Sequence, residues 1–461
     1  MLLNCKKALL IYRKLRTLQI KTKLTLFVDL IQANCRSFHY NSANTLLIYS
    51  SNLLRIQGAP MMQITDLQKE QKITPLLRLG FRPFFLSGAI FGIIAIILWL
   101  LMYKGTVSVS PLGGGYWWHI HEMIFGFGCA IIAGFLLTAV QNWTGARGAQ
   151  GNTLLVLFLL WLAGRVVLLI PDFLGATLTT LVDLSFLPAV AFVLAKPIIA
   201  IKQYRNLFFV PLLLLFTLAN LEMHLAIYYP QTFTTRFSAY SGVMLVTFLM
   251  SVMAGRVTPM FTANGTKTAK ATPLPWLDKI TNGSLAIAMF YLLLQPLLGF
   301  SEEFFGILLI VAGFFQTMRW LRWKPWITLG VPLLWSIHIA IKFIAYGLIV
   351  LGLSYLIPEI PTNHIWHLLT IGGMGGLILA MISRVSLGHT GRPLSPPKAM
   401  TLAYILITLA ALIRALGPWA LPEKTLLFID ISGTFWLLAF GIFVVTYAPM
   451  LTSARKDGRP G

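Results

Sequence analysis

Charged residues are scarce in this chain of 461 residues: they make up 11% of it, whereas 57% of the residues are hydrophobic. Such a sequence cannot fold as an ordinary soluble domain, because too much apolar side chain would face water. Acidic residues are the scarcer kind, with 14 Asp and Glu against 36 Lys and Arg, which gives a formal net charge of +22. The basic residues lie in short loops between apolar runs instead of forming one basic face. Their placement is typical of a membrane protein, and nucleic-acid binding is not expected.

Cysteine is also sparse, and the three that occur, Cys5, Cys35 and Cys129, form no CxxC pair and no disulfide framework. The sequence lacks a phosphate-binding P-loop, a dinucleotide fingerprint and a nucleophile elbow. Hydrolase or kinase chemistry of the soluble type is therefore not expected.

Residues 1–75 contain no apolar run near the ~20 residues that a membrane-spanning helix needs. They are basic and mixed in polarity, and no small-residue cleavage site follows an apolar core, so they do not form an ordinary signal peptide. Two interpretations remain. The segment is either a cytoplasmic extension or upstream sequence translated from too early a start, with Met61 or Met62 as the true initiator. Both predict a poorly ordered segment ahead of a membrane domain at 76–453 and a cytoplasmic tail at 454–461.

The rest of the chain is a series of apolar runs, each long enough to cross a bilayer as a helix. We therefore predict an all-α, polytopic bundle of about twelve transmembrane helices. The runs lie near 84–103, 118–140, 153–171, 174–201, 206–229, 237–262, 282–300, 303–320, 330–357, 363–388, 399–417 and 427–450.

Lys and Arg are unevenly distributed between the loops. The loop after the second run and every second loop thereafter hold most of them, whereas the alternate loops hold few. Cytoplasmic loops are enriched in Lys and Arg, so both termini are expected in the cytoplasm. The second and tenth runs then begin at the outer face. Five of the eight histidines share this outer depth: His119, His121, His224, His364 and His367.

The second and tenth runs follow one plan. Aligning His121 with His367 places Gly126 on Gly372 and carries the register to Thr-Gly near both helix ends without a gap. The similarity of two histidine-bearing helices suggests one shared site.

The sixth run resembles a third copy of this plan. Its end at 256–262 (RVTPMFT) resembles 384–390 (RVSLGHT), although Ala239 stands where the other copies have histidine. The repeat therefore recurs every fourth helix, at the second, sixth and tenth. Repeated four-helix arcs are a plausible scaffold for a site between copies.

Haem is the cofactor that this pattern favours, because a haem between helices needs axial imidazoles and small residues where the macrocycle meets backbone. His119 and His121 point about 200° apart on a helix, and His121, in register with His367, is the expected partner of His367. Glycines follow both histidines. Spacings such as Gly372-x-x-x-Gly376 also serve ordinary membrane-helix packing, and imidazole also suits copper, so both alternatives stay open.

Other polar residues could support this site. Glu122 could hold a ligand proton or relay protons, or it could be a solvated carboxylate at the outer end. Arg165 lies at the depth of the histidines and is the expected partner of a haem propionate. His224 could add to the cluster, whereas His389 lies at the inner end of the tenth run.

The chain resembles the NnrS family of bacterial inner-membrane proteins over residues 78 to about 450, through motifs that include His119, His121, Glu122 and His389. The resemblance implies a twelve-helix protein that contains haem and copper and takes part in the response to nitric oxide and nitrosative stress, often near denitrification functions. The motifs are GFRPFFL at 80–86, WHIHEMIFG at 118–126, GFLLTAV at 134–140, NWTG at 142–145, GR at 255–256 with PMF at 259–261, and MISRVSLGHTGR at 381–392.

The plan also resembles, more loosely, the main subunit of haem-copper oxidases, with twelve helices in arcs of four and haem-binding histidines on helices two and ten. Those oxidases carry copper-binding histidines on helices six and seven, and this sequence has none there. Copper would have to use other histidines, such as His119, His224, His364 or His389.

We therefore expect a haem protein that protects against nitric oxide by binding or redox chemistry, with the bilayer, nitric oxide and an electron donor as partners. In this hypothesis His121 and His367 are axial ligands, and His119 and His364 are neighbours or copper ligands. A transporter of a metal complex or small anion, and a sensory or assembly protein, are the alternatives. The transporter predicts substrate-dependent flux and no bound chromophore, and the sensor predicts a soluble partner.

Overall fold

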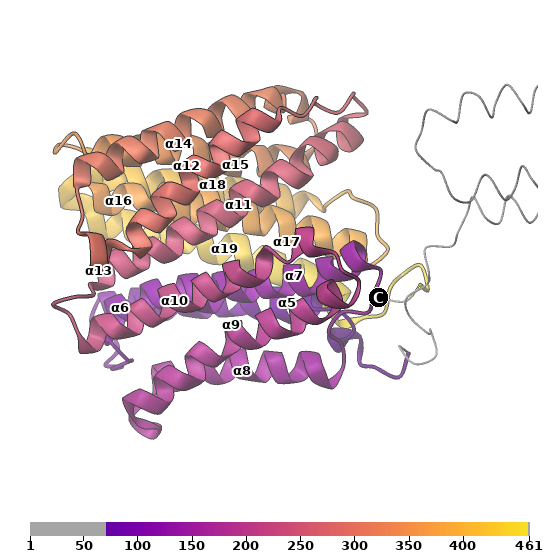
Figure 1. The fold of residues 1–461 in the computed structure, drawn as a ribbon, viewed down its shortest axis with the longest axis horizontal. Coiled ribbons are helices and arrows are strands. Elements are labelled where there is room, and N and C mark those ends of the chain that lie inside the picture. The colour runs from indigo at the N-terminus through magenta and orange to yellow at the C-terminus, as the bar shows by residue number, and fades with distance from the viewer. Residues whose placement is uncertain (1–70, 460–461) are drawn as a thin grey trace, which may run out of the picture. The chain divides into compact units, whose positions relative to one another are not determined.

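The computed structural model describes residues 71–459, and this part of the chain is all-helical, without a strand (Figure 1). The expectations for the first 70 residues and for the initiator methionine lie outside it. The long helices are α5 (Phe81–Tyr103), α6 (Gly114–His121) continued by η2 (Glu122–Gly128) and α7 (Cys129–Thr144), α8 (Asn152–Leu169), α9 (Gly175–Ala200), α10 (Phe209–Tyr228), α11 (Thr235–Thr266), α12 (Pro275–Leu293), α14 (Glu302–Arg322), α15 (Pro332–Ser354), α16 (Thr362–His367) continued by η6 (Leu368–Gly375) and α17 (Gly376–His389), α18 (Lys398–Ala420) and α19 (Thr425–Thr452).

Local sequence signals set several of the helix ends. The hydroxyl groups of Thr234 and Ser301 accept hydrogen bonds from backbone N–H groups in the first turns of α11 and α14, which is how such residues begin helices. Gly145 ends α7 with a φ of 69°, a left-handed conformation that glycine adopts without strain.

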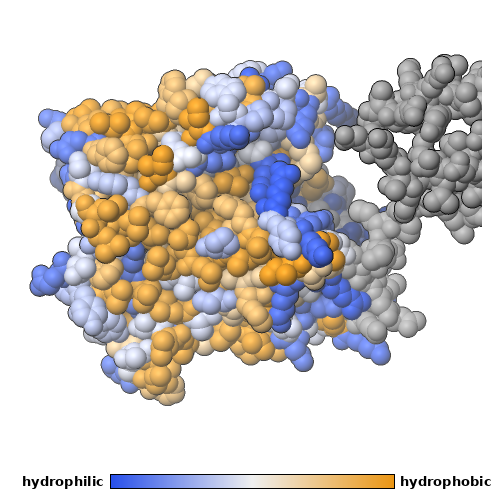
Figure 2. All heavy atoms as spheres, viewed as in Figure 1, coloured by the Kyte–Doolittle hydropathy of each residue, from blue (hydrophilic) through white to orange (hydrophobic). Residues whose placement is uncertain are grey.

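The helices have the composition and surface of a membrane protein. Within residues 71–459, eleven helices are long and apolar enough to cross a membrane. Large apolar side chains remain exposed on the outside of the bundle, and Val445, for example, is 79% exposed. Figure 2 shows apolar residues across the middle of one face and hydrophilic residues toward its ends. The chain is therefore a multi-pass integral membrane protein, as the sequence predicts.

The seventh run, which we expected at 282–300, has different bounds in the structure. The helix there, α12, covers Pro275–Leu293, and a separate short helix, α13 (Gln295–Leu298), follows it. Asp278, Lys279 and Asn282 in its first turns lower the mean hydropathy of α12, so it is not among the eleven apolar spans. It nevertheless packs along both α11 and α14.

The second, sixth and tenth long helices form the centre of the bundle. In each of these three, 78% of the most apolar segment is buried, against 33 to 61% in the other eight spans. The middle helix of the three, α11, packs against both η2 and η6. The three similar sequence segments are thus the three most enclosed helices.

Both histidine-bearing helices change from α-helical to π-helical pairing directly after a histidine. The π-helical segment η2 begins after His121, and η6 begins after His367. Such segments hold an extra residue per turn and occur often at functional sites. Each segment therefore changes the side of the helix on which the histidine lies, relative to the residues that follow the segment.

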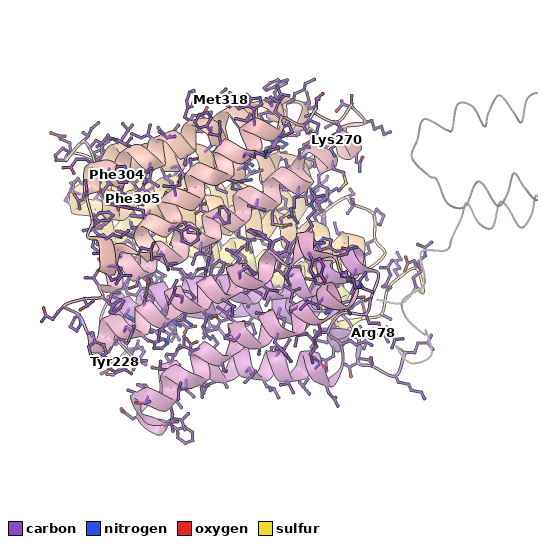
Figure 3. All side chains as sticks on the ribbon, viewed as in Figure 1. Arg78, Tyr228, Lys270, Phe304, Phe305 and Met318 are labelled. Carbon is purple, nitrogen blue, oxygen red and sulfur yellow. The ribbon has the colours of Figure 1, made fainter. Side chains whose placement is uncertain are left out.

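The two ends of the bundle differ. α6 and α16 begin at one end, which we call the histidine end, and the C-terminus lies at the other, which we call the basic end (Figure 1). Figure 3 places Tyr228, Phe304 and Phe305 at the histidine end, and Arg78 and Lys270 at the basic end.

Candidate cofactor cavity and buried charge cluster

The histidines of the second long helix point to two different places. His121 is fully buried, and its ring nitrogens contact side chains of α9, α10 and η2. His119 lines a cavity on the other side, together with His364 and His367. The sequence spacing predicted this divergence, but the residue that joins His367 is His119 and not the expected His121.

His121 belongs to a buried charge cluster centred on Asp183 of α9. Asp183 Oδ2 accepts hydrogen bonds from His121 Nε2 at 3.1 Å and from His224 Nε2 at 3.0 Å. Asp183 Oδ1 pairs with the guanidinium of Arg165, which also donates to Glu122 Oε2 at 2.7 Å. All of these side chains are at most 6% exposed. We call Glu122, His121, Arg165, Asp183, Asn220 and His224 the charge cluster.

Both ring nitrogens of His121 lie within hydrogen-bonding distance of side-chain oxygens. Its Nε2 lies 2.7 Å from Asn220 Oδ1, and Asn220 Nδ2 donates to Asp183 at 2.8 Å, which identifies the amide oxygen. Its Nδ1 lies 3.3 Å from Glu122 Oε1. Both ring nitrogens thus face oxygen acceptors, and only an imidazolium donates from both. Two cations, His121 and Arg165, then balance two carboxylates, Glu122 and Asp183, which is what burial of charge requires.

Gly126 packs against the charge cluster, and its lack of a side chain leaves space for the charged groups. A Cβ at this position would collide with Glu122 Oε2, Arg165 Nη1 and the ring of Phe91. The backbone oxygen of Gly126, within the π-helical segment, accepts a hydrogen bond from Trp161 Nε1 at 2.9 Å. Gly126 therefore makes space for the ion pair of Glu122 and Arg165, and not for a porphyrin ring as the sequence pattern suggested.

A cavity of about 270 Å³, here called the histidine cavity, is lined by His119, His364 and His367. Its walls are largely apolar or aromatic. Lining residues come from six helices and include Trp99, His119, Tyr240, His367, Arg414 and Trp436. A largely apolar hollow with a few convergent polar groups is the usual form of a ligand site.

The ring of His367 is held by a hydrogen bond to the backbone of its own helix. Its Nδ1 lies 3.2 Å from the backbone oxygen of His364, so Nδ1 carries the proton and donates it. The lone pair is then on Nε2. A histidine that donates one N–H to a backbone carbonyl while its other nitrogen binds metal is the common arrangement.

His364 has the opposite tautomer. Arg414 Nη1 lies 2.7 Å from His364 Nδ1, and a guanidinium only donates, so Nδ1 accepts and the ring proton is on Nε2. His364 in this arrangement has no free lone pair for a metal. His119 stacks on Trp99, with ring centroids 4.4 Å apart, and its buried Nδ1 has no hydrogen-bond partner.

Several residues that the sequence assigns to one site have other contacts in the structure. His121 and His367 share neither a hydrogen bond nor the histidine cavity, and Arg165 pairs with Glu122 and Asp183 and not with an open anion site. His389 packs on Phe81 at 5.5 Å, far along α17 from His367. The glycines after His367 do not line the cavity; a Cβ on Gly372, for example, would collide with the ring of Phe343 in α15.

Sequence reasoning missed Asp183, Asn220 and Arg414. A signal for two of them exists, because an ionisable residue within an apolar run is costly in a membrane and marks a functional site. Asp183 lies within the fourth run and Arg414 within the eleventh.

Three residues of the charge cluster could also hold a metal ion. Ligand atoms of His121, Asp183 and His224 all lie within 4.8 Å of one another, and all three residues are buried. Two imidazoles and a carboxylate suit a transition metal. A metal here would replace the protons that His121 and His224 now donate to Asp183.

A family model described as "NnrS protein" matches residues 75–455 of this chain. None of the curated proteins matches it.

Proposed function

Because the chain belongs to the NnrS family of membrane proteins, which is associated with the nitric oxide response, we propose that it binds a haem in the histidine cavity. His367 would be an axial ligand, through Nε2. The single observation that supports this most directly is the tautomer of His367, whose Nδ1 donates to the carbonyl of His364. A bound haem would supply an iron that binds nitric oxide or exchanges electrons.

His119 is the second candidate for an axial ligand. It lines the same cavity, it stacks on Trp99, and its Nδ1 is a buried polar atom without a partner. An orphaned buried nitrogen of this kind calls for an explanation, and rotation or ligation of the ring on haem binding would provide one. His121 is excluded from this role as long as both of its nitrogens donate within the charge cluster.

Absorption spectra of the purified protein test the proposal, recorded oxidised, then reduced with dithionite, and again after addition of nitric oxide. We expect a Soret band that shifts on reduction and again with nitric oxide. His367→Ala should lose the band and His119→Ala should shift it. His121→Ala should keep it. His338→Ala is the matched control, because His338 is buried but bonds Thr262, at 2.8 Å, outside the cavity. A colourless protein that stays folded after expression with ample haem would contradict the proposal.

A metal ion in the charge cluster is a second candidate, supported by the spacing of His121, Asp183 and His224. Copper fits this donor set. Elemental analysis of the purified protein tests it: His224→Ala should lower the metal content while leaving the Soret band in place, and unchanged metal content would exclude the site. This outcome is independent of the haem spectrum, because the two groups of residues do not overlap.

A further inference from the structure

Arg414 is a cation that lines the histidine cavity, and none of the carboxylates in residues 71–459 pairs with it. It projects from α18 into the cavity. In the part of the chain that the structure describes, its one hydrogen bond runs to His364 Nδ1, and it forms no ion pair. The lining of the cavity contains no Asp or Glu.

The contrast between Arg414 and Arg165 is informative. Arg165 has two carboxylate partners within the protein, so its charge is neutralised before any ligand binds. Arg414 shares the cavity with apolar and aromatic residues such as Trp99, Ile429 and Trp436, and the other polar side chains of the lining are histidines, tyrosines, an asparagine, a threonine and a serine. A cation held in mostly apolar surroundings inside a membrane protein is costly unless it is paired.

We propose that Arg414 binds a carboxylate of the ligand in the histidine cavity, and that this ligand is an apolar molecule with an acidic edge. The inference rests on the proposed function, under which the carboxylate is a propionate of haem. A guanidinium offers five N–H donors in a planar fork that matches a carboxylate. One donor is used by His364, which fixes the direction of the fork, and the others remain for the ligand.

The arrangement of helices fits a ligand held at two points. α16, which carries His367, packs directly against α18, which carries Arg414. His364 lies between the two groups, because its carbonyl accepts from His367 and its Nδ1 accepts from Arg414. A ligand bound to His367 through its metal would thus have its anionic edge anchored by the neighbouring helix.

Esterification of the ligand isolates this contact. The full-length protein is titrated with haem and with haem dimethyl ester, which differ only in the two carboxylates, and also with metal-free protoporphyrin IX and its dimethyl ester. The metal-free pair reports the carboxylate contact without iron ligation by His367. The variants are Arg414→Gln, which removes the charge, and Arg414→Lys, which keeps it. The control Arg322→Gln removes an exposed arginine at the basic end of α14.

We expect the unaltered protein to bind the acids about tenfold or more tightly than the esters, since a charge-assisted pair contributes on this scale. Arg414→Gln should weaken binding of the acids to the level of the esters and leave the esters unaffected. Arg414→Lys should keep part of the difference, and Arg322→Gln should keep all of it. A merely structural role for Arg414 would instead weaken acid and ester alike.

Three results would overturn the inference. Equal binding of acid and ester by the unaltered protein would remove the carboxylate contact while leaving haem binding intact. If nitrite shifted the spectrum of the unaltered protein but not of Arg414→Gln, with acid and ester still equal, Arg414 would be assigned to a free anion. No binding of any porphyrin by the folded protein would overturn both this inference and the proposed function.

Discussion

The histidines differ in how many of their ring nitrogens donate hydrogen bonds, and this difference indicates different roles. His121 donates from both nitrogens to oxygen acceptors, His367 donates from one to a carbonyl, and His364 accepts from a guanidinium. A ring that donates from both nitrogens has no lone pair for a metal. The protonated ring of His121 therefore belongs to a charge-paired cluster, whereas His367, in the histidine cavity, keeps a nitrogen that its hydrogen bond to His364 does not use.

Loss of the Asp183 carboxylate should strongly destabilise the protein, because this group pairs with Arg165 and accepts from His121 and His224. Asp183→Asn keeps the shape of the side chain but leaves Arg165 and His121 with one carboxylate between them. Breaking a buried charge pair costs about 3–5 kcal/mol. We expect a large drop in the melting temperature of the detergent-solubilised protein. Asp172→Asn is the control, because Asp172 is exposed in the short helix η3 (Pro171–Phe173), and this variant should melt as the unaltered protein does. Equal melting of the two variants would show that the cluster is not charge-balanced.

The neutrality of the charge cluster can be tested by removing one charge of each sign. His121→Gln removes a cation, Glu122→Gln removes an anion, and the two side chains contact each other at 3.3 Å. Each single variant should be destabilised, and the double variant should be less destabilised than the sum, with a coupling of about 0.5–3 kcal/mol. Thermal unfolding of all four proteins measures the coupling. Strict additivity would mean that His121 is neutral.

At the scale of the helix, glycine positions show which surfaces are in contact. Gly372 lies in η6, and a Cβ there would collide with the ring of Phe343 near its attachment to the chain. Gly441 lies in α19 with nothing within 4 Å of an added Cβ. We expect Gly372→Ala to destabilise the bundle by about 1–3 kcal/mol and Gly441→Ala to stabilise it by up to about 1 kcal/mol. Thermal unfolding in one detergent compares the two variants. If Gly372→Ala were harmless, η6 and α15 would not be in close contact.

The helices themselves were largely predictable, because long apolar runs with Gly, Pro and polar residues between them have few other solutions in a membrane. Which side each helix buries was not predictable. Helices that are apolar all round give no directional pattern, and the π-helical segments after His121 and His367 shift the phase without a sequence signal. This explains why the histidines were placed at one end correctly while His121 was assigned to the wrong neighbours.

The contact between Arg165 and Asp183 was not predictable from the sequence either. Arg165 was expected beside the histidines, and it does contact the group that contains His121. Its carboxylate partner Asp183 lies on the next helix, 18 residues along the chain. The residue pattern of one helix does not show which residue of another helix it contacts. The presence of an ionisable residue within an apolar run is the sequence signal that marks Asp183.

At the scale of the whole molecule, α12 determines whether the two ends of the membrane domain lie on the same side. Eleven crossings would separate Arg78 from the C-terminus, whereas twelve would place them together. α12 has 19 residues, or about 28 Å of helix, which is close to the ~30 Å of a bilayer core. Figure 3 places Lys270, before α12, at the basic end and Phe304, after it, at the histidine end. We therefore expect α12 to cross the membrane despite its polar first turns.

Labelling of single cysteines in cells tests this topology. In a background without Cys5, Cys35 and Cys129, we would compare Lys270→Cys with Glu303→Cys, both exposed, using a maleimide that does not cross membranes. Because the basic loops are expected in the cytoplasm, Glu303→Cys should react in intact cells and Lys270→Cys only after lysis. Lys398→Cys, at an exposed position at the start of α18, should behave as Lys270→Cys does. Equal labelling of Lys270→Cys and Glu303→Cys would mean that α12 does not cross, and a reversed pattern would place the histidine cavity on the cytoplasmic side, where the reducing compartment could supply electrons directly.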